Sequence, residues 1–491
     1  MKCSNSIVFI NPNLVFQRND FFTTGIVYMP VTLATFVGYV HSQGYSCKVI
    51  DAFGEKPNQL WYKENFAFRG LRPQEICEKI PDDVVAICIY AGNVTYHESV
   101  MDIIKCIRKP FSSVPLIVLE NSQAVTAYSL ENVKKDFYEV GANFIITGDL
   151  EVNGLSLIEH IYTKSRDPYE PSQEKIKDLD TLPFPAWQYF SLENYWNLQY
   201  AHGPLTSDKY LPILSSRGCP YACRFCVIPA TNDLKWRARS AAHVVDEMEF
   251  FYRTLGVQEY HFEDVDPTIH EERIQHIALE ILKRSLKIRW KICSGTKAET
   301  LKQWKTLELM QASGCTFIAI APESGSARLM KFINKPSDQN HIVGLIQSIK
   351  KLKMRSQAAF VIGFPGETPE DRLLTQRFIK QLVKAGLDEI AIYMITPVPG
   401  SAIYNQFSGY TTYSELNFSP AWRHDFSKLN RFRLKLYINF LIWKFMYSPL
   451  SVFRHFTNLL TRNFENKIEM TLFRALHMYV LTMKRLLKQG A

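Results

Sequence analysis

The 491-residue sequence predicts an α/β protein: an N-terminal doubly wound parallel-sheet domain, a partial (β/α)6 barrel and an α-helical C-terminal region. Two series of short β-branched runs alternate with amphipathic patterns, as in parallel sheets covered by helices. The chain is long enough for two or three domains. Its 46% hydrophobic and 21% charged residues exclude a disordered protein. We expect boundaries at 1–164, 165–204, 205–405 and 406–491.

Five strands are expected in residues 1–164, at SIVFINP, CKVIDA, VVAICIY, PLIVLE and NFIITGD. Each is a continuous apolar run, which is typical of strands covered on both faces. A doubly wound sheet binds ligands beyond the carboxyl ends of its strands. In this sequence those ends fall at residues 11–13, 92–94, 120–122 and 148 onward.

Six further strands are expected in residues 205–405, at LPILSSRG, EYHFEDV, RWKICSG, TFIAIAPES, AAFVIGFPG and EIAIYMITP. Six βα repeats predict a full or partial barrel, whose chemistry lies at the carboxyl ends of the strands. Polar residues of this segment cluster at those ends. The connector, residues 165–204, is rich in Pro and aromatic residues, which predicts an ordered segment.

Three of the ten cysteines stand together in RGCPYACRFC, as Cys219, Cys223 and Cys226. No export signal is recognisable, so thiols or metal ligands are expected rather than disulfides. The C-x3-C-x2-C spacing, on a loop shaped by Gly218 and Pro220, favours a 4Fe-4S cluster with one iron left open. A zinc site and three unrelated thiols are the alternatives.

The segment 205–405 resembles the radical S-adenosylmethionine (SAM) enzymes, whose signature is CxxxCx(aromatic)C. Phe225 fills the aromatic place, beside the adenine of SAM in that family. The resemblance implies candidate SAM contacts at successive strand ends: Phe225, Glu263, Asp264, Ser294, Glu323, Ser324, Gly363 and Phe364. Glu263 and Asp264 match the segment that holds the SAM amino group. The alternative interpretation is a solvated strand end that caps the next helix for Glu263 and Asp264, and a helix N-cap for Glu323 and Ser324.

The same resemblance implies the chemistry. SAM chelates the open iron, and a one-electron transfer yields a 5′-deoxyadenosyl radical that abstracts hydrogen from unactivated carbon. An electron donor such as flavodoxin or ferredoxin is therefore an expected partner. The sequence does not identify the residue that orients the target carbon.

A doubly wound domain followed by PFPAW and RGCPYACRFC is similar to the cobalamin-binding branch of this family, over about residues 5–405. The similarity implies cobalamin between the two domains, with Asn121, Ser122 and Gly148 as candidate contacts. The chain departs from the branch in having LENSQA where relatives carry a Gly-Gly pair, and GDLEVNG where they carry a Gly-Glu-Gly-Glu-like run. Side chains at Glu120 and Asn121 occupy space that glycines would leave open.

The expected activity is methylation of an unactivated carbon of a small-molecule or lipid-like substrate, with two SAM molecules consumed. A cyclase, rearrangement or oxidative enzyme of the same branch is the alternative. tRNA methylthiolation is disfavoured, because such enzymes carry three further N-terminal cysteines and a C-terminal β-barrel.

The net charge of +9 lies almost wholly in the tail. Residues 421–491 hold 13 Lys and Arg, 3 Asp and Glu, and 13 Phe, Tyr and Trp. A helical cap over the barrel is favoured over peripheral contact with a membrane, and nucleic-acid binding is disfavoured. No apolar run reaches the roughly 18 residues of a spanning helix, so a cytoplasmic location is expected, with or without that peripheral contact.

Overall fold

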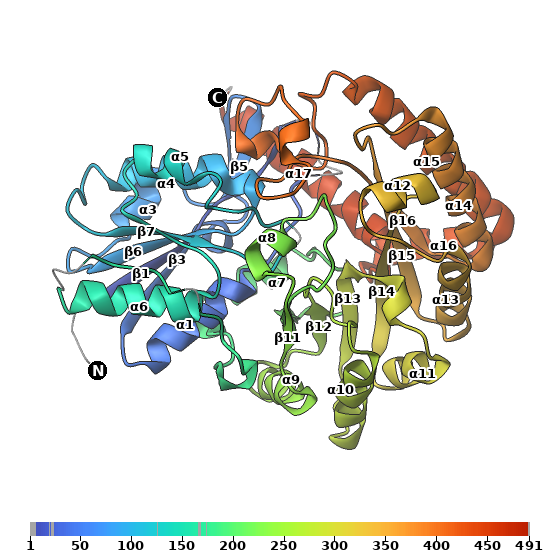
Figure 1. Cartoon of the computed structure of the whole chain (residues 1–491), viewed down its shortest axis with the longest axis horizontal. Helices are drawn as coiled ribbons and strands as arrows, with labels where there is room; N and C mark the ends of the chain where they lie inside the picture. Colours follow the sequence, from blue (N-terminus) through green and yellow to red (C-terminus); the bar gives the residue numbers. More distant parts are fainter. Residues whose placement is uncertain are drawn as a thin grey trace.

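The computed structural model describes residues 6–489, apart from 19, 21–23, 125, 165–167 and 173. Two mainly helix-covered parallel sheets lie side by side, and three long helices follow the second sheet (Figure 1). This arrangement confirms the α/β class, with two parallel sheets and a helical C-terminal region.

The N-terminal sheet has the strand order β3-β1-β6-β7-β8, and all its pairs are parallel. Its strands are β1 (Ser6–Asn11), β3 (Ser46–Asp51), β6 (Ala86–Ala91), β7 (Leu116–Glu120) and β8 (Phe144–Ile146). The helices around it are α1 (Val31–Ser42), α3 (Pro73–Glu78), α4 (His97–Ile107), α5 (Lys134–Glu139) and α6 (Leu150–Tyr162).

Both faces of this sheet are buried, as its continuous apolar strands require. Ile7 and Phe9 pack in the core that contains residues of α1 and α6, whereas Val8 and Ile10 pack in the core that contains residues of α3 and α4. In Figure 1 these two helix pairs cover opposite sides of the sheet. The five predicted strands are all present.

A small antiparallel sheet was not predicted. Its order is β2-β5-β4, from β2 (Leu14–Gln17), β4 (Leu60–Lys63) and β5 (Phe66–Arg69). Each strand is four residues long, too short for a periodic signal. The sheet forms a contact surface for the C-terminal helix, since Met478 packs with Phe16 and Ala67.

The second sheet has the order β16-β15-β14-β13-β12-β9, again all parallel. Its strands are β9 (Tyr210–Ile213), β12 (Glu259–Phe262), β13 (Arg289–Thr296), β14 (Cys315–Glu323), β15 (Arg355–Ile362) and β16 (Glu389–Met394). The covering helices are α9 (Ala241–Leu255), α10 (Glu271–Lys283), α11 (Trp304–Ala312), α13 (Gln339–Lys351) and α14 (Pro369–Ala385). Because the strand order is open, with β16 and β9 unpaired to each other, the barrel is partial.

Tail helices α15 (Phe426–Tyr447), α16 (Pro449–Thr461) and α17 (Lys467–Gln489) complete the barrel side. The first turn of α17 reaches the inner face of the sheet: Lys467 Nζ donates to the carbonyl of Cys293 at 2.7 Å, and the Ile468 amide donates to Glu389 at 2.9 Å. In the described part of the chain, none of the helices is both long enough and apolar enough to cross a membrane.

The connector is ordered where it is described. The Ala186 amide donates to the carbonyl of Ala34 in α1 at 2.9 Å, and Trp187 is fully buried beside it. At Gly38, a Cβ would lie 3.0 Å from the carbonyl oxygen of Phe184. This close approach seats the connector on α1.

A buried ion cluster joins the two domains. Arg217, two residues before the first cysteine of the loop, donates to both carboxylate oxygens of Glu151 at 2.7 and 2.8 Å and to Asp149 at 3.3 Å. Arg237, on the strand paired with that of Arg217, also binds Asp149. Both acids begin α6, and their side chains are about 1% exposed. The cluster therefore fixes the cysteine loop to the N-terminal domain.

Amides reinforce this junction. The Gly218 amide donates to Gln123 Oε1 at 3.1 Å, and Asn232 Nδ2 donates to the carbonyl of Ser122 at 2.7 Å. Gly218 has φ +78°, and a Cβ there would lie 2.1 Å from the carbonyl oxygen of Lys235. Glycine is required at this position.

Breaking the ion cluster will destabilise the fold. Glu151→Gln removes one carboxylate from a buried guanidinium, and such a loss costs about 3–5 kcal/mol. We expect urea unfolding to show a fall of about 3 kcal/mol in the free energy of unfolding. Glu139→Gln is the matched control: its carboxylate pairs with Lys135 at 3.6 Å on the surface, so the loss should be below about 1 kcal/mol. Equal losses for the two variants would contradict the role given to the cluster.

Candidate active site

The three cysteines lie on the loop between β10 (Ser216–Gly218) and α8 (Ile228–Asn232), at the boundary of the two domains (Figure 1). Cys219 and Cys226 pack against a small apolar cluster that includes Ala127 of the N-terminal domain. The loop is also tied to the barrel, since the Arg224 amide donates to the carbonyl of Ile333 at 3.0 Å. Apolar surroundings and a pinned backbone hold the three thiols in place.

The donor set fits an iron-sulfur cluster. Burial raises the pKa of Cys219 to about 11 and that of Cys226 to about 12, so thiolates there need a cationic centre. Among the described residues, the donors that converge within 4.8 Å, as a single ion needs, are His261, Glu263 and Cys293. The loop sulfurs are spread more widely, which suits a cluster whose irons each take one thiolate.

Phe225 and Phe364 form an edge-to-face pair, with ring centroids 5.8 Å apart. The structure thus brings together the aromatic residue of the cysteine loop and the end of β15. Gly363 has φ +83°, its amide donates to Glu367 at 2.9 Å and its carbonyl accepts from Arg423 at 3.0 Å. A Cβ at Gly363 would lie 2.6 Å from Leu429, so glycine lets α15 approach.

Lys335 links Glu323, at the end of β14, to the cysteine loop, because it pairs with Glu323 and lies near Cys223. Lys335 Nζ donates to Glu323 Oε1 at 2.6 Å; the Glu323 side chain is buried, and that of Lys335 is partly buried. Burial opposes the charge of Lys335, but Glu323 and the nearby Cys223 outweigh it and raise the pKa of the ammonium group. Glu323 has φ +60°, a left-handed conformation uncommon for a side-chain-bearing residue. Sequence reasoning did not identify Lys335, because it lies beyond the strand end, after helix α12 (Ala327–Phe332).

Glu263 and Ser294 meet at the ends of β12 and β13. Ser294 Oγ donates to Glu263 Oε2 at 2.9 Å, and His202 Nδ1 donates to the same oxygen at 2.6 Å. Burial would raise the pKa of Glu263, but the hydrogen bond from His202 and the positive charge nearby, that of Lys467 included, outweigh burial and hold the pKa below its ordinary value. Burial lowers the pKa of His202 itself. An ionised Glu263 beside a neutral imidazole agrees with both directions.

Lys467 of α17 completes this network. Its Nζ lies 3.3 Å from His202 Nε2, so a neutral imidazole protonated on Nδ1 can accept from Lys467 and donate to Glu263. The ammonium beside Cys293 and Glu263 disfavours a second cation there, although His261, Glu263 and Cys293 converge as metal donors. His202 and Lys467 escaped sequence reasoning because they lie outside the barrel repeats.

Asp264 and Ser324 make structural contacts. The Asp264 carboxylate accepts from the Ser215 amide at 3.1 Å, from Ser215 Oγ at 2.8 Å and from Ser216 Oγ at 2.5 Å, which fixes the chain leading to the cysteines. Ser324 Oγ lies 3.0 Å from Thr375 Oγ1 and accepts from the Ser326 amide at 3.1 Å. SAM contact by either residue stays a prediction.

A central cavity lies between the two domains at the carboxyl ends of their strands. Its N-terminal wall contains Thr32, Gly92, Asn93, Asn121 and Gln123, and its barrel wall contains His202, Tyr210, His261, Glu263 and Ser294. Within the described chain, the buried atoms Tyr210 Oη and His261 Nδ1 have no hydrogen-bond partner. Both residues line the cavity, so these two unpaired polar atoms lie in its wall.

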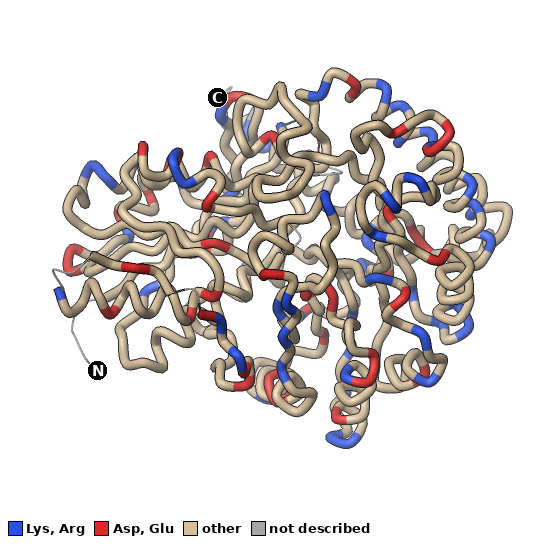
Figure 2. Tube along the Cα trace, viewed as in Figure 1, with Lys and Arg blue, Asp and Glu red and all other residues tan. Residues whose placement is uncertain are grey.

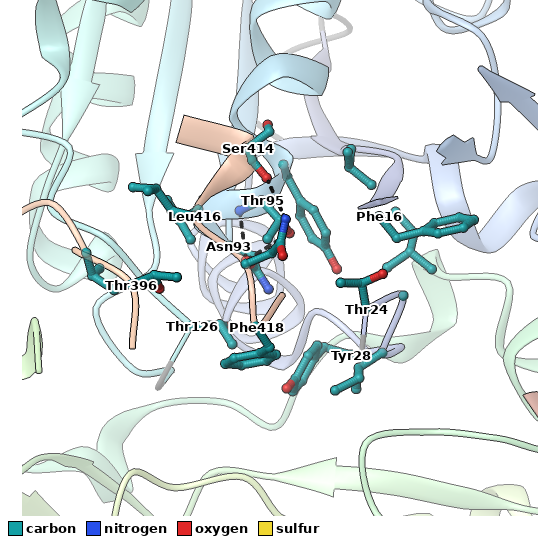
Figure 3. Close-up of a pocket in the computed structure, with 18 residues that line it drawn as sticks. Phe16, Thr24, Tyr28, Asn93, Thr95, Thr126, Thr396, Ser414, Leu416 and Phe418 are labelled. Carbon is teal, nitrogen blue, oxygen red and sulfur yellow. Dashed lines mark hydrogen bonds between the residues drawn. The ribbon is translucent and has the colours of Figure 1, made fainter. Parts of the chain in front are cut away.

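An outer cavity adjoins the central one and shares Tyr28, Asn93, Tyr96 and Thr126 with it. Figure 3 shows its wall of aromatic and hydroxyl side chains, with Asn93 bonded to the Thr95 amide and hydroxyl. One side comes from the N-terminal domain and the other from residues 414–418. Burial raises the pKa of Tyr28 well above its ordinary value, so its hydroxyl is neutral.

The candidate cobalamin contacts divide. Asn121 lines the central cavity and donates to the carbonyl of Gly92 at 3.1 Å. Ser122 instead donates to the carbonyl of Gly148 at 3.2 Å, which ties two strand ends together. Glu120 accepts from the amides of Leu130 and Gly148 at 2.9 and 3.1 Å. Of the two side chains that stand where relatives carry glycines, Glu120 therefore braces the loops outside the cavity lining, whereas Asn121 lines the cavity.

A third cavity, the tail cavity, has a volume of about 710 Å³ and lies between β16, α15 and α17. Apolar side chains form most of its wall, and its polar groups include His202, Gln357, Glu389, Arg433 and Lys467. It shares Ala201 and His202 with the central cavity. Its size is typical of sites for small organic ligands.

The family model of the radical SAM superfamily matches residues 213–379. The matched segment, about a third of the chain, runs from the end of β9 into α14. It contains the cysteine loop together with Glu263, Ser294 and Glu323.

Curated relatives include an uncharacterized methyltransferase of Pyrococcus horikoshii, 27% identical over 52% of this chain and 51% of that protein. Cytidylyl-2-hydroxyethylphosphonate methyltransferase of Streptomyces wedmorensis is 27% identical over 48% of this chain and 45% of its own. The chain therefore spans about half the length of these relatives.

Among solved structures, the radical SAM methyltransferase TsrM from Kitasatospora setae, with cobalamin and a [4Fe-4S] cluster bound, has a TM-score of 0.61 at 14% identity. The likeness covers 84% of this chain and 76% of TsrM. Both domains, and not the barrel alone, therefore share that fold.

Glu389, in the wall of the tail cavity, should make the stability of the fold depend on pH. Burial raises the pKa of Glu389 to about 8, although the Ile468 amide and Lys467 act in the opposite direction. Because the folded pKa lies above the ordinary 4.5, ionisation opposes folding, and stability falls as the pH rises from about 4.5 to about 8. In Glu389→Gln this fall should shrink by up to about 1.4 kcal/mol per pH unit, measured by urea unfolding across that range. The exposed control Glu370→Gln should keep the wild-type profile, and parallel profiles for all three proteins would refute the assignment.

Proposed function

We propose that the protein is a cobalamin-dependent radical SAM enzyme that methylates an unactivated carbon of a lipid-like small molecule. One observation carries the proposal. The strand ends of an N-terminal doubly wound domain and the cysteine loop of a radical SAM domain face each other at one junction, with the central cavity between the domains. A reaction that needs both cofactors needs such a shared site.

In this proposal Cys219, Cys223 and Cys226 hold the cluster, and SAM lies on the barrel side of the central cavity. The reduced cluster supplies the electron that cleaves SAM, and an electron donor such as flavodoxin or ferredoxin reduces the cluster. Glu263 is the residue that we assign to the SAM amino group, because it is ionised and lines the cavity. Asp264 is a positioning residue for the cysteine loop.

The remaining SAM contacts follow from their positions. Ser294, bonded to Glu263, is placed to contact the methionyl part of SAM. Phe225, Gly363 and Phe364 lie together at the adenine side. Glu323 and Ser324 frame the loop on the other side, and Lys335 balances the charge of Glu323 beside Cys223.

Cobalamin is proposed for the N-terminal side, against Asn93, Asn121 and the exposed backbone of Gly92. The outer and central cavities each hold about 70 Å³ of free space, less than a corrin ring requires. We infer that their loop walls, residues 24–30, 92–96 and 121–124, separate when the cofactor binds. These three segments lie outside the strands, so they can move while the strand residues that supply the rest of the lining stay in place.

The tail cavity supports a lipid-like substrate. Its walls are largely apolar, and Ala201 and His202 join it to the central cavity. An elongated molecule with an apolar body would therefore present one end to the reacting centre. The inner end of the cavity, at His202, is buried, and this keeps bulk water away from the reacting centre.

Methyl transfer is tested with methyl-deuterated SAM. Anaerobically reconstituted protein, incubated with cobalamin, a reductant and a lipid and metabolite extract, should yield a product that is heavier by three mass units than the product from unlabelled SAM. Mass spectrometry reads this shift. A product without label would favour the alternative, a cyclase, rearrangement or oxidative reaction of the same branch.

Cysteine variants provide the control for that experiment. Cys223→Ala should lose the cluster absorbance, SAM cleavage and product, because the open cluster needs all three thiolates. Cys106→Ala, which changes a half-buried thiol of the N-terminal domain, should retain all three. Turnover by Cys223→Ala at more than a few per cent of wild type would overturn the radical mechanism.

A further inference from the structure

The tail helices expose an unusual amount of apolar surface. The described residues include 24 large hydrophobic side chains that are exposed, and 17 of them lie between Leu434 and Leu487. Leu450, Phe453 and Phe456 of α16 are 82, 68 and 65% exposed. Soluble monomers rarely expose apolar side chains in such concentration.

The exposed residues form stripes along each helix. On α15 they recur as Leu434, Ile438, Leu441, Ile442 and Phe445, at the spacing of one helical face. The opposite face of α15, with Leu436, Phe440 and Trp443, is buried against the barrel. A helix that is apolar on both faces is usually covered on both.

Leu450, Phe453 and Phe456 form the stripe on α16. The stripe on α17 runs through Leu472, Leu476, Tyr479, Val480 and Met483. Helix α16 contacts both α15 and α17. We call the exposed stripes of α15, α16 and α17 together the tail surface.

Charges on the tail surface are of one sign. Its exposed charged side chains, within the described residues from 421 onward, are all basic: Lys428, Arg431, Lys435, Arg454, Arg462 and Lys484. Figure 2 shows Lys and Arg recurring along α15. The acids of this region, Asp425, Glu465 and Glu469, are at least partly buried, and they pair with Arg423, Arg355 and His455. Apolar stripes with an exposed basic charge complement an anionic lipid surface.

The tail cavity opens on this surface. Leu434 and Leu441 of α15 and Leu472 of α17 line the cavity and are each about half exposed, at 54, 53 and 47%. The mouth of the cavity therefore lies between two apolar stripes, and its inner end is at His202.

We propose that the tail surface docks on an anionic lipid bilayer and that the substrate enters the tail cavity from that bilayer. Basic side chains contact the headgroups, and the apolar stripes of α15, α16 and α17 lie at the headgroup and acyl-chain boundary without crossing the membrane. A second copy of the chain fits less well, because it would bring like charges together. Substrate entry rests on the proposed function, whereas docking does not.

Vesicle flotation of the full-length reconstituted protein tests docking. Vesicles of phosphatidylcholine with about one third phosphatidylserine should carry the protein upward, and phosphatidylcholine alone should carry much less. Phe453→Ser/Phe456→Ser should lower the bound fraction at least about tenfold, since two aromatic anchors leave the interface. The matched control, Leu279→Ser/Leu282→Ser, changes two exposed leucines of α10 and should bind like wild type.

Light scattering on the same samples tests the alternative, in which a second copy of the chain covers the tail surface. The proposal expects a monomer in solution at the concentrations used for flotation. It is overturned if the wild type floats with neither vesicle, if both double variants lose binding equally, or if the wild type is a dimer that Phe453→Ser/Phe456→Ser dissociates. The labelled-SAM experiment is independent of flotation, so failure of the enzyme assignment and failure of docking are distinguishable.

Discussion

The buried ion cluster of Asp149, Glu151, Arg217 and Arg237 is the interaction on which the site depends. It binds the start of α6, in one domain, to the two paired strands that flank the cysteine loop, in the other. Its charges cannot be satisfied elsewhere without a large desolvation penalty, so the pairing specifies one relative position of the two domains. The central cavity is a consequence of that position.

The chain differs from the branch it resembles at LENSQA and GDLEVNG, and the structure gives the physical reason for both. Glu120 accepts two backbone amides and braces the strand ends. Asp149 and Glu151 supply the acids of the junction. Gln123 reaches across to Gly218. At these positions side chains hold the loops in place, whereas glycines would offer only their backbone.

The eleven strands of the two parallel sheets were predictable, because each is a continuous apolar run between helical patterns. The four-residue strands β2, β4 and β5 were not, and neither was the pairing of β10 with β11 (Trp236–Ala238), since these strands are too short to show a period. Of the site, Cys219, Glu263 and Ser294 follow from strand-end positions. His202 and Lys467 do not, because a connector and a distant helix bring them to the barrel only in three dimensions.

The C-terminal helices contribute both to the tail surface and to the polar network of the candidate active site. Helix α17 places Lys467 in the polar network, lines the tail cavity and carries an exposed apolar stripe. The sequence favoured a helical cap over a membrane contact. In our proposal one segment serves both purposes, because its buried face closes the barrel while its outer face remains available for lipid.

The central claim is that one cavity between the domains serves both cofactors. Pulsed electron paramagnetic resonance on protein that holds cob(II)alamin and a reduced 4Fe-4S cluster tests it directly, because two unpaired spins at one site couple through their dipoles. The account predicts a dipolar coupling in the wild type that weakens or becomes broadly distributed in Glu151→Gln, where the junction is loosened. A protein that binds both cofactors without coupling, or that binds the cluster and no cobalamin, would contradict it.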